Sequence, residues 1–574
     1  MFSHRKILYA LLFTVAGLNG AAHAAPARSI KEWVSCSGTT DESDGAIKAF
    51  AAAANDAFTL IVDCPVRLHS GLAIDRAIFI DNHTTVKFTG SGQFIVDNLF
   101  HPAFVLANST NVTLLDWNVV WEGTVPVNPN VGGYELAGKF VRSGGNIQPA
   151  GAFNDIILSK WLEEHRGIIF KKAPGYVNPI WVGGVNASAV FYITGNTSQV
   201  VFSGLSLTVP PSAGGHNFMP MAFSVSENWL SGQTLTGETP RSSPYVSVPH
   251  DLTFSDITLD GTLMGWQGSV QNTLFENITS KRYGDLQDAN GNYVGGMNKW
   301  FPPPHLFYLN HTLSGDSTLY NTNLHFETVK DIGPRVGVAR DKSRSDSVSG
   351  YALSLKLGCS YCSVNDYTSS RPDGFMDVLS SDNLTVSNVV ATFDSEFIHN
   401  LFPVGLRFPA VGYTNVTFEN VQMTDTAAST LSGIIGNAAS SSNVGIIFKN
   451  FHIDMQRWAE SAMPMPTIGG NTNDVVMTFS MSAQSMQVAQ RLYHEVSSAL
   501  QETPLTVRAG GATVRLTWDS RGAESCTANG AWAGSIAVRG SQVVKSAAAK
   551  EYDFGLTCQS STVSLPASLK VITQ

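Results

Sequence analysis

The segment Asn415-Val-Thr-Phe-Glu-Asn-Val421 places apolar residues at alternate positions and an Asn near its end. Alternation of this kind over about six to eight residues, with β-branched side chains among them, predicts a half-buried β-strand. The pattern recurs along the middle of the chain, in segments that begin at Asn111, Gln199, Asp251, Asn272, Asn323, Asn383 and Val444. A pattern that recurs this often along a chain indicates a repeat architecture.

The central apolar residue of each strand sets the period of the repeat. These anchor residues are Phe202, Phe254, Phe275, Phe326, Val364, Val386, Phe418 and Phe448. Gaps of 21 and 22 residues between anchors fit one bare turn of a solenoid, whereas gaps of 51 and 52 fit either two turns or one turn with a long loop. Because no helical pattern separates the strands, we expect a parallel β-helix whose Asn and Asp residues stack at the bends.

The composition excludes several classes of protein. Only 14% of the 574 residues are charged, while 43% are hydrophobic and 10% are aromatic. A disordered chain needs more charge and fewer aromatic residues, and coiled coils and collagens have different compositions. The formal net charge of −9 gives no global attraction to nucleic acid, so a nucleic-acid partner is not expected.

Residues 1–24 are expected to form a secretory signal peptide. They carry Arg5 and Lys6, then an apolar run from Ile7 to Leu18, and they end on Ala-His-Ala24. The run is shorter than the roughly 20 residues of a membrane-spanning helix. We therefore expect an exported protein, extracellular or periplasmic, without a membrane span.

The cysteines fall into three local pairs along the chain. Export permits disulfides, and a structural role is expected for each pair. The Cys359-x-x-Cys362 motif is also compatible with a redox centre or half of a zinc site, but no second such motif and no βαβ pattern accompany it. The expected disulfide partners are Cys36 with Cys64, Cys359 with Cys362, and Cys526 with Cys558.

Two further segments point to a known superfamily. The segment from Thr40 to Phe50 joins an acidic turn to a short helical pattern, and Asp373-Gly-Phe-Met-Asp377-Val378 precedes the strand at Asn383. With the repeat, these segments resemble the pectate-lyase-like right-handed β-helix superfamily over roughly residues 30–480. The resemblance implies an all-β, right-handed parallel β-helix domain at 25–480 with an N-terminal cap, and the activity of a polysaccharide lyase or a β-helix glycoside hydrolase.

The tail differs from the repeat. Residues 481–502 are expected to be a linker or short helix, and residues 503–574 a small β-sandwich. Alternating segments such as Thr513-Val-Arg-Leu-Thr-Trp518, together with two cysteines 32 residues apart, are typical of such a sandwich. The tail resembles the Ig-like modules found at the ends of bacterial secreted enzymes.

Three charged residues are expected on one face of the coil. Lys356, Asp377 and Arg407 lie 8, 9 and 11 residues before the anchors of their own turns. If the anchors superpose, these residues lie on consecutive turns, with Asp373 one bend away and His399 in a neighbouring loop. Such a set suits β-elimination from a uronate, in which a cation neutralises the carboxylate and a base removes the acidified C5 proton.

The resemblance to pectate lyases also suggests roles for these residues. It implies Asp373 and Asp377 as Ca²⁺ ligands and Arg407 or Lys356 as the base. The insertion between the anchors at 275 and 364 is expected to bind the polysaccharide, because aromatic rings stack on sugars and cations grip carboxylates. The candidate substrate-binding residues are Lys299, Trp300, His305, Arg335, Arg340 and Lys342.

Other functions stay open beside the leading one. The carboxylates of Asp373 and Asp377 could instead hydrolyse a glycosidic bond, and a β-helix can also be a non-catalytic glycan-binding protein or adhesin. A nucleophile elbow is absent from the sequence, and so are Rossmann and Walker patterns in the right context. We expect a secreted enzyme that degrades an acidic polysaccharide by β-elimination.

Overall fold

The structure is a computed structural model of the whole chain. It describes residues 25–68, 77–97, 102–122, 127–128, 133–134, 141–143, 146–148, 165–166, 168–169, 189–210, 221–226, 228–230, 246–262, 264–281, 305–309, 321–332, 351–355, 358–370, 374–378, 381–393, 406–408, 413–425, 435–437, 446–455, 476–481, 506–509, 513–520, 524–537, 539–545, 551–559 and 564–573. The expected signal peptide lies outside these residues. No helix in these ranges has the length and apolar character needed to cross a membrane.

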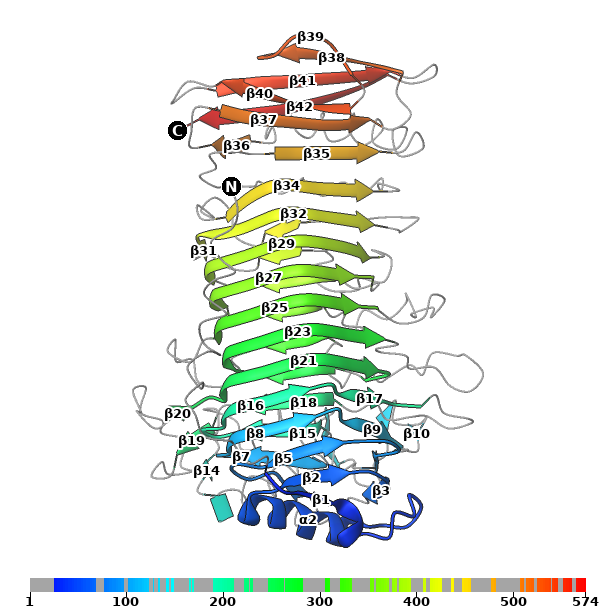
Figure 1. Ribbon diagram of the computed structural model, residues 1–574. Coiled ribbons are helices and arrows are strands. Elements are labelled where there is room, and N and C mark those ends of the chain that lie inside the picture. Colours follow the sequence, from blue (N-terminus) through cyan, green and yellow to red (C-terminus); the bar gives the residue numbers. More distant parts are fainter. Residues whose placement is uncertain are drawn as a thin grey trace.

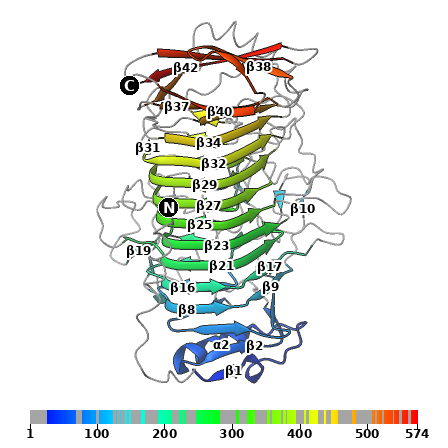
Figure 2. The same ribbon diagram turned by 45° about the horizontal axis from the view of Figure 1, so that its top comes forward.

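Parallel strands stack along one axis and form a right-handed parallel β-helix, as the sequence predicts (Figure 1). One long sheet, sheet A, follows the length of the coil, and Figure 2 shows its strands stacked in chain order. Its main strands are β2 (Thr59–Val62), β5 (Thr85–Phe88), β8 (Thr110–Leu115), β16 (Ser198–Ser203), β21 (His250–Asp260), β23 (Gln271–Lys281), β25 (Asn321–Asp331), β27 (Cys359–Ser369), β29 (Ser381–Phe393), β32 (Val416–Asp425), β34 (Ile446–Met455) and β35 (Val476–Met481).

A second sheet, sheet B, forms another side of the coil. Each turn contributes one strand to it before the chain returns to sheet A. Its strands are β4 (Ile78–Phe79), β7 (Phe104–Ala107), β15 (Ala189–Thr194), β18 (Met221–Ser226), β22 (Met264–Gly268), β24 (Phe307–Leu309), β26 (Tyr351–Leu355), β28 (Gly374–Val378), β30 (Leu406–Phe408) and β33 (Ile435–Asn437).

The early turns split each sheet A segment into two short strands, and the later turns fuse them. The strand β17 pairs with the second half of β21, while β16 pairs with its first half. The short second strands of these early turns are β3 (Pro65–Leu68), β6 (Gln93–Val96), β9 (Asn118–Trp121) and β17 (Ser206–Thr208). The strand β1 (Ala27–Ser29) pairs with β2 at the start of sheet A, and the two-residue β31 (Tyr413–Thr414) pairs with the start of β29. Small antiparallel pieces outside the coil are β10 (Val127–Asn128), β11 (Gly133–Tyr134), β12 (Val141–Ser143), β13 (Asn146–Gln148), β14 (Ile168–Ile169), β19 (Asn228–Leu230) and β20 (Val246–Ser247).

Residues with a left-handed backbone bend the long strands of sheet A. In β29 they are Asn383 and Asn388, both at φ 55°. Asn tolerates this conformation because its short amide hydrogen-bonds locally. The amides also stack from turn to turn, since Asn415 Nδ2 donates to Asn383 Oδ1 (3.0 Å) and Asn420 Nδ2 donates to Asn388 Oδ1 (3.2 Å). The expected Asn ladder is confirmed.

The anchor residues lie level with one another, as expected. Phe202 pairs in register with Phe254, and Phe275 with Phe326, so gaps of 52 and 51 residues each span a single turn with a long insertion. The register continues through the later anchors up to Phe448. The number of residues between successive strands therefore varies, while the register of the anchor residues is the same in every pair.

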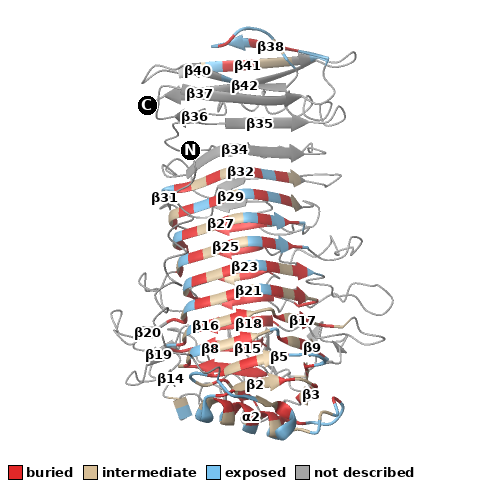
Figure 3. Cartoon of the chain, viewed as in Figure 1, coloured by how far each residue is buried: buried red, intermediate tan, exposed pale blue. Residues whose placement is uncertain are grey.

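Two rows of stacked aromatic rings fill the inside of the coil, where the buried residues of successive strands lie (Figure 3 shows the burial of each residue). In sheet A the rings of successive anchors stack with centroids 4.9 to 5.3 Å apart. In sheet B a second row stacks at 4.9 to 5.1 Å, from Phe104 through Phe191, Phe223 and Trp266 to Phe307. The two rows meet edge to face, which is a favoured aromatic geometry.

A helix closes the first turn. Helix α2 (Ser43–Asp56) follows the short 3₁₀ segment η1 (Ile30–Glu32) and buries Ala49 and Phe50 against the coil. A disulfide joins Cys36 to Cys64 beside it. The cap covers apolar side chains that the first turn would otherwise expose. Both the capping helix and this disulfide agree with the sequence-based expectation.

The tail strands form the other end of the molecule as a small β-sandwich (Figure 1). One layer continues sheet A, since β37 (Thr513–Ser520) pairs in parallel with β35 and antiparallel with β40 (Arg539–Lys545). Cys526 is disulfide-bonded, and its register partner is Cys558. The other layer contains β36 (Thr506–Ala509), β38 (Ser525–Gly530), β39 (Gly534–Ile536), β41 (Glu551–Gln559) and β42 (Ser564–Thr573). The expected linker, apart from Met481, lies outside the described residues.

Candidate functional site

The outer face of sheet B carries an unbroken row of residues that are mostly polar. The ring of Phe223 contacts Phe202 and Phe254 of sheet A, so Phe223 points inward, and its neighbour Ser224 points outward by strand alternation. The residues level with Ser224 on successive turns form what we call the outer row: Tyr192, Ser224, Gln267, Tyr308, Ser354, Asp377 and Arg407.

Most described members of the outer row are buried although they point away from the core, and Tyr308 is half-buried. Gln267 is 5% exposed, Ser354 is 0% exposed and Asp377 is 3% exposed. Burying a polar group without a hydrogen bond costs about 1–3 kcal/mol. Gln267 Oε1 and Ser354 Oγ have no hydrogen-bond partner among the described residues. The hydroxyl group of a bound ligand can donate the hydrogen bond that such a buried oxygen lacks.

An aspartate and an arginine occupy adjacent turns of this row. Asp377 is the register partner of Arg407, and neighbouring strands lie about 4.8 Å apart. Asp377 lies between Met376 and Val378, which both belong to the core, so its carboxyl group is outward. The predicted closeness of Asp377 and Arg407 is therefore found, with the side chain of Arg407 itself outside the described part.

Lys356 lies outside the described residues, so its predicted place near Asp377 stays a prediction. Ser354 is the residue level with Asp377. The corner between the sheets has three residues between β26 and β27 but only two between β28 and β29. Counting back from an anchor therefore does not land on the same position in both turns.

His305 is the other predicted site residue that the structure describes. It is 2% exposed, and the Tyr351 N–H donates to its Nδ1 at 2.8 Å. Its ring stacks on Tyr308 of the outer row, with centroids 4.6 Å apart. His305 is thus placed to hold Tyr308. The remaining predicted residues lie outside the described part: Asp373, His399, Lys299, Trp300, Arg335, Arg340 and Lys342.

The expected Ca²⁺ ligands can be tested only in part. Asp373 lies outside the described residues, and Asp377 is flanked in register by a hydroxyl and a cation. The described residues contain no group of three His, Cys, Asp or Glu side chains able to hold a metal ion. Ca²⁺ takes six to eight oxygen ligands, so a site that includes Asp373 and Asp377 stays a prediction.

Five members of the outer row escaped the sequence-based prediction, and they are Tyr192, Ser224, Gln267, Tyr308 and Ser354. Each is a polar or aromatic position within a short, largely apolar strand. The only signal in the sequence is that position: Gln267 and Ser354 are each the one polar side chain of a five-residue strand. Recognising them requires the register of sheet B, which a search for alternating strands does not provide.

Comparisons with known proteins add little. No family model matches the sequence, and no curated protein matches it. Two solved structures align with 95% of the chain: full-length tailspike protein 2 of an Escherichia coli O157:H7 bacteriophage (TM-score 0.26, 8% identity) and the enzymatically active domain of bacteriophage CBA120 tailspike protein 2 (TM-score 0.27, 8% identity). The chain spans 63% and 70% of their lengths. At TM-scores this low, the likeness supports no conclusion on fold or function.

Proposed function

We propose that this protein is a secreted enzyme that cleaves an acidic, uronate-containing polysaccharide by β-elimination on the outer face of sheet B. The observation that carries the proposal is the register pairing of Asp377 with Arg407 within a row of buried polar residues. Export, and hence access to such a polysaccharide, rests on the N-terminal sequence alone.

The proposed mechanism divides the chemistry between the two charges. A guanidinium stays protonated in proteins and binds carboxylates with two parallel hydrogen bonds. Arg407 is therefore suited to hold the uronate carboxylate, which acidifies the C5 proton. Asp377 accepts that proton, the C4–C5 double bond forms, the C4–O bond to the leaving sugar breaks, and the leaving oxygen takes up a proton from water. Burial of Asp377 strengthens its electrostatic contacts because little water competes.

The neutral members of the row are given the task of binding the sugar chain. Gln267 Oε1 and Ser354 Oγ lie on turns that precede Asp377, and they can accept hydrogen bonds from sugar hydroxyls. Tyr308 lies between them and offers a ring to a pyranose face. The row follows the coil axis, so successive turns match successive units of an extended chain.

The test is turnover of a panel of uronate polysaccharides by purified protein. The unsaturated product of elimination absorbs in the ultraviolet, so absorbance and new reducing ends are expected to rise together. Asp377→Asn and Arg407→Ala are each expected to lower the rate at least about 100-fold. Reducing ends without absorbance would assign hydrolysis by paired carboxylates instead. Binding without either signal would assign a non-catalytic glycan-binding protein.

A matched control separates chemistry from folding. Asp256→Asn makes the same change at an exposed bend of β21, where φ is 55° and Asn fits. This control is expected to keep full activity. If Asp377→Asn lowers the thermal midpoint far more than Asp256→Asn does, Asp377 is a structural residue and the assignment of the base fails.

A further inference from the structure

In strand β27 of sheet A, a tyrosine stands at the first bend between the asparagines of the two neighbouring turns. The ladder position holds Asn in the turns before and after, but in β27 it holds Tyr361. Tyr361 has a left-handed backbone (φ 58°) and its side chain is 62% exposed. A bulky residue in this conformation is a genuine outlier, and such strain concentrates at functional sites.

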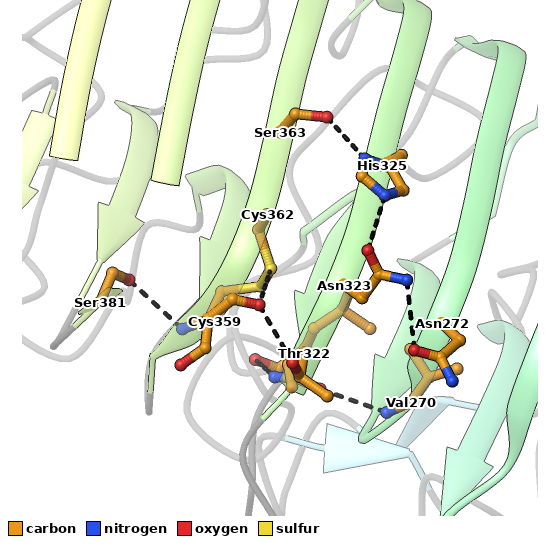
Figure 4. The surroundings of a disulfide bond; sticks show 12 residues. Val270, Asn272, Thr322, Asn323, His325, Cys359, Cys362, Ser363 and Ser381 are labelled. Carbon is orange, nitrogen blue, oxygen red and sulfur yellow. Dashed lines mark hydrogen bonds between the residues drawn. A yellow bond between two sulfur atoms is a disulfide. The ribbon is translucent and has the colours of Figure 1, made fainter. Parts of the chain in front are cut away.

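The tyrosine redirects one hydrogen bond of the Asn ladder. At this bend Asn323 Nδ2 donates to Asn272 Oδ1 of the preceding turn (3.2 Å), and Asn415 Nδ2 donates to Asn383 Oδ1 in the same way. Since Tyr361 has no amide to donate, Asn323 Oδ1 is left for another donor. That donor is His325, whose Nε2 lies 2.9 Å from Asn323 Oδ1 (Figure 4).

The redirected bond sets the state of the His325 ring. Because Nε2 donates to an amide oxygen, it carries the ring proton in the neutral form, and Nδ1 keeps a lone pair. Ser363 Oγ of the next turn lies 2.8 Å from Nδ1, so its hydroxyl donates to the ring. Serine, histidine and asparagine thus form a nucleophile, a base and an orienting group in hydrogen-bond sequence.

The surroundings keep His325 in its basic form. Burial lowers the pKa of His325, and the charge of Glu327 opposes that shift. Among the described side chains of β25 and of its two neighbours β23 and β27, the charged groups on the same outward rows are Glu276 of β23 and Glu327 of β25. Strand β27 presents Ser363 and Asn365 there, and Asn365 Nδ2 donates to Glu327 Oε2 at 2.8 Å.

A disulfide holds the strand just before the serine. Cys359 and Cys362 are 1% and 3% exposed, and a disulfide joins them (Figure 4). Ser360 and Tyr361 are the two residues between them in the sequence. The Cys359 N–H also donates to Ser381 Oγ of the following turn (3.2 Å). Reactive groups work best when the backbone that presents them is fixed by bonds of this kind.

We propose that Ser363 is an activated nucleophile and that Ser363, His325 and Asn323 form an acyl-transfer site for carboxylic esters, such as O-acyl groups on a sugar. Ser363 Oγ attacks the ester carbonyl while its proton moves to His325 Nδ1. The proton then passes to the departing alcohol as the C–O bond breaks. Water hydrolyses the serine ester by the same route. Tyr361 supplies an exposed ring against which the acyl carrier packs.

The experiment uses the full chain and a fluorophosphonate, which phosphonylates activated serines. Peptide mapping of wild-type protein is expected to find the label on Ser363, together with hydrolysis of p-nitrophenyl acetate. Ser363→Ala removes both, and His325→Gln lowers both at least about 100-fold. Ser387→Ala is the matched control, because Ser387 is a half-buried serine on the same face that donates to Asn365 Oδ1 (3.1 Å) rather than to a histidine.

The pH profile separates an orienting role from a structural one. The labelling rate is expected to rise with pH through a midpoint below pH 6.5, because burial holds the pKa of His325 below that value. Asn323→Gly removes the amide but tolerates the left-handed backbone (φ 54°). This variant is expected to label more slowly with a shifted pH midpoint. Absence of label on Ser363 in folded wild-type protein, or equal labelling of Ser387, overturns the proposal.

Discussion

Sheets A and B have similar inner faces, but their outer faces differ in how far the residues are buried. Both line the coil with stacked rings, and Phe223 of sheet B meets Phe254 of sheet A edge to face at 5.1 Å. On the outside, however, the strands of sheet A alternate between buried and half-buried residues, whereas those of sheet B are buried at almost every position. The inner face defines the fold, and the outer faces are where one turn differs chemically from another.

Because of that difference, an outward polar side chain costs more folding free energy on sheet B than on sheet A. A half-buried serine on sheet A keeps contact with water and costs little. A buried serine or glutamine on sheet B loses water and must find a partner or destabilise the fold. The outer row of sheet B is therefore the less expected feature, and Gln267 and Ser354 are the residues at which it is best tested.

The largest expected effect tests whether the two inner rows are equivalent. Phe223→Ala and Phe254→Ala each remove a fully buried ring, so each is expected to lower the free energy of unfolding by about 3–5 kcal/mol. Because the rings touch, the double variant is expected to lose less than the sum. Denaturant unfolding measures all three values. A large loss from only one sheet would break the equivalence.

The inner row of sheet A is also the part of the fold that the sequence predicts well. All the repeat copies found by alternation are sheet A strands, and their anchors superpose in the structure. Sheet B strands such as Tyr351–Leu355 are buried on both faces and show no alternation, so a search with period two passes over them. The coil was predictable from one of its sheets.

The candidate sites were less predictable, for reasons of register. Asp377 and Arg407 could be brought together by counting from anchors, but Ser354, the register partner of Asp377 on the preceding turn, was missed because the corner after β26 is one residue longer than the corner after β28. Ser363 and His325 lie 38 residues apart on neighbouring turns. No local motif signals that pair, since the strand pairing of the coil brings the two residues together.

An intermediate effect is expected at the outer row of sheet B. Gln267→Met keeps the volume and removes a buried oxygen without a partner among the described residues, so it is expected to raise the free energy of unfolding by about 1–3 kcal/mol. Ser255→Ala, at a half-buried outward position of sheet A, is the control and is expected to change it by less than about 0.5 kcal/mol. Destabilisation by Gln267→Met would show that the amide oxygen has a partner and that the two outer faces differ less than the burial indicates.

The smallest effect concerns the outer face of sheet A, through the titration of His325. Burial holds the pKa of His325 below its ordinary 6.5, with Glu327 opposing. The folded state therefore binds fewer protons than the unfolded chain just below pH 6.5, and stability falls as pH falls through that window. The contribution is present in full above the unfolded pKa. Because the ring is only half-buried, it is expected to amount to a fraction of the 1.4 kcal/mol or so that one pKa unit represents.

Thermal melts of the wild type and of His325→Gln at pH 7.5 and pH 5.5 measure this contribution. The wild type is expected to lose more stability between the two values than His325→Gln does, because the glutamine does not titrate. Ser387→Ala leaves the histidine in place and is expected to keep the wild-type difference. Equal differences for the wild type and His325→Gln would mean that the ring titrates as it does in water. The outer face of sheet A would then be an ordinary solvated surface, and the base proposed for Ser363 would lose its support.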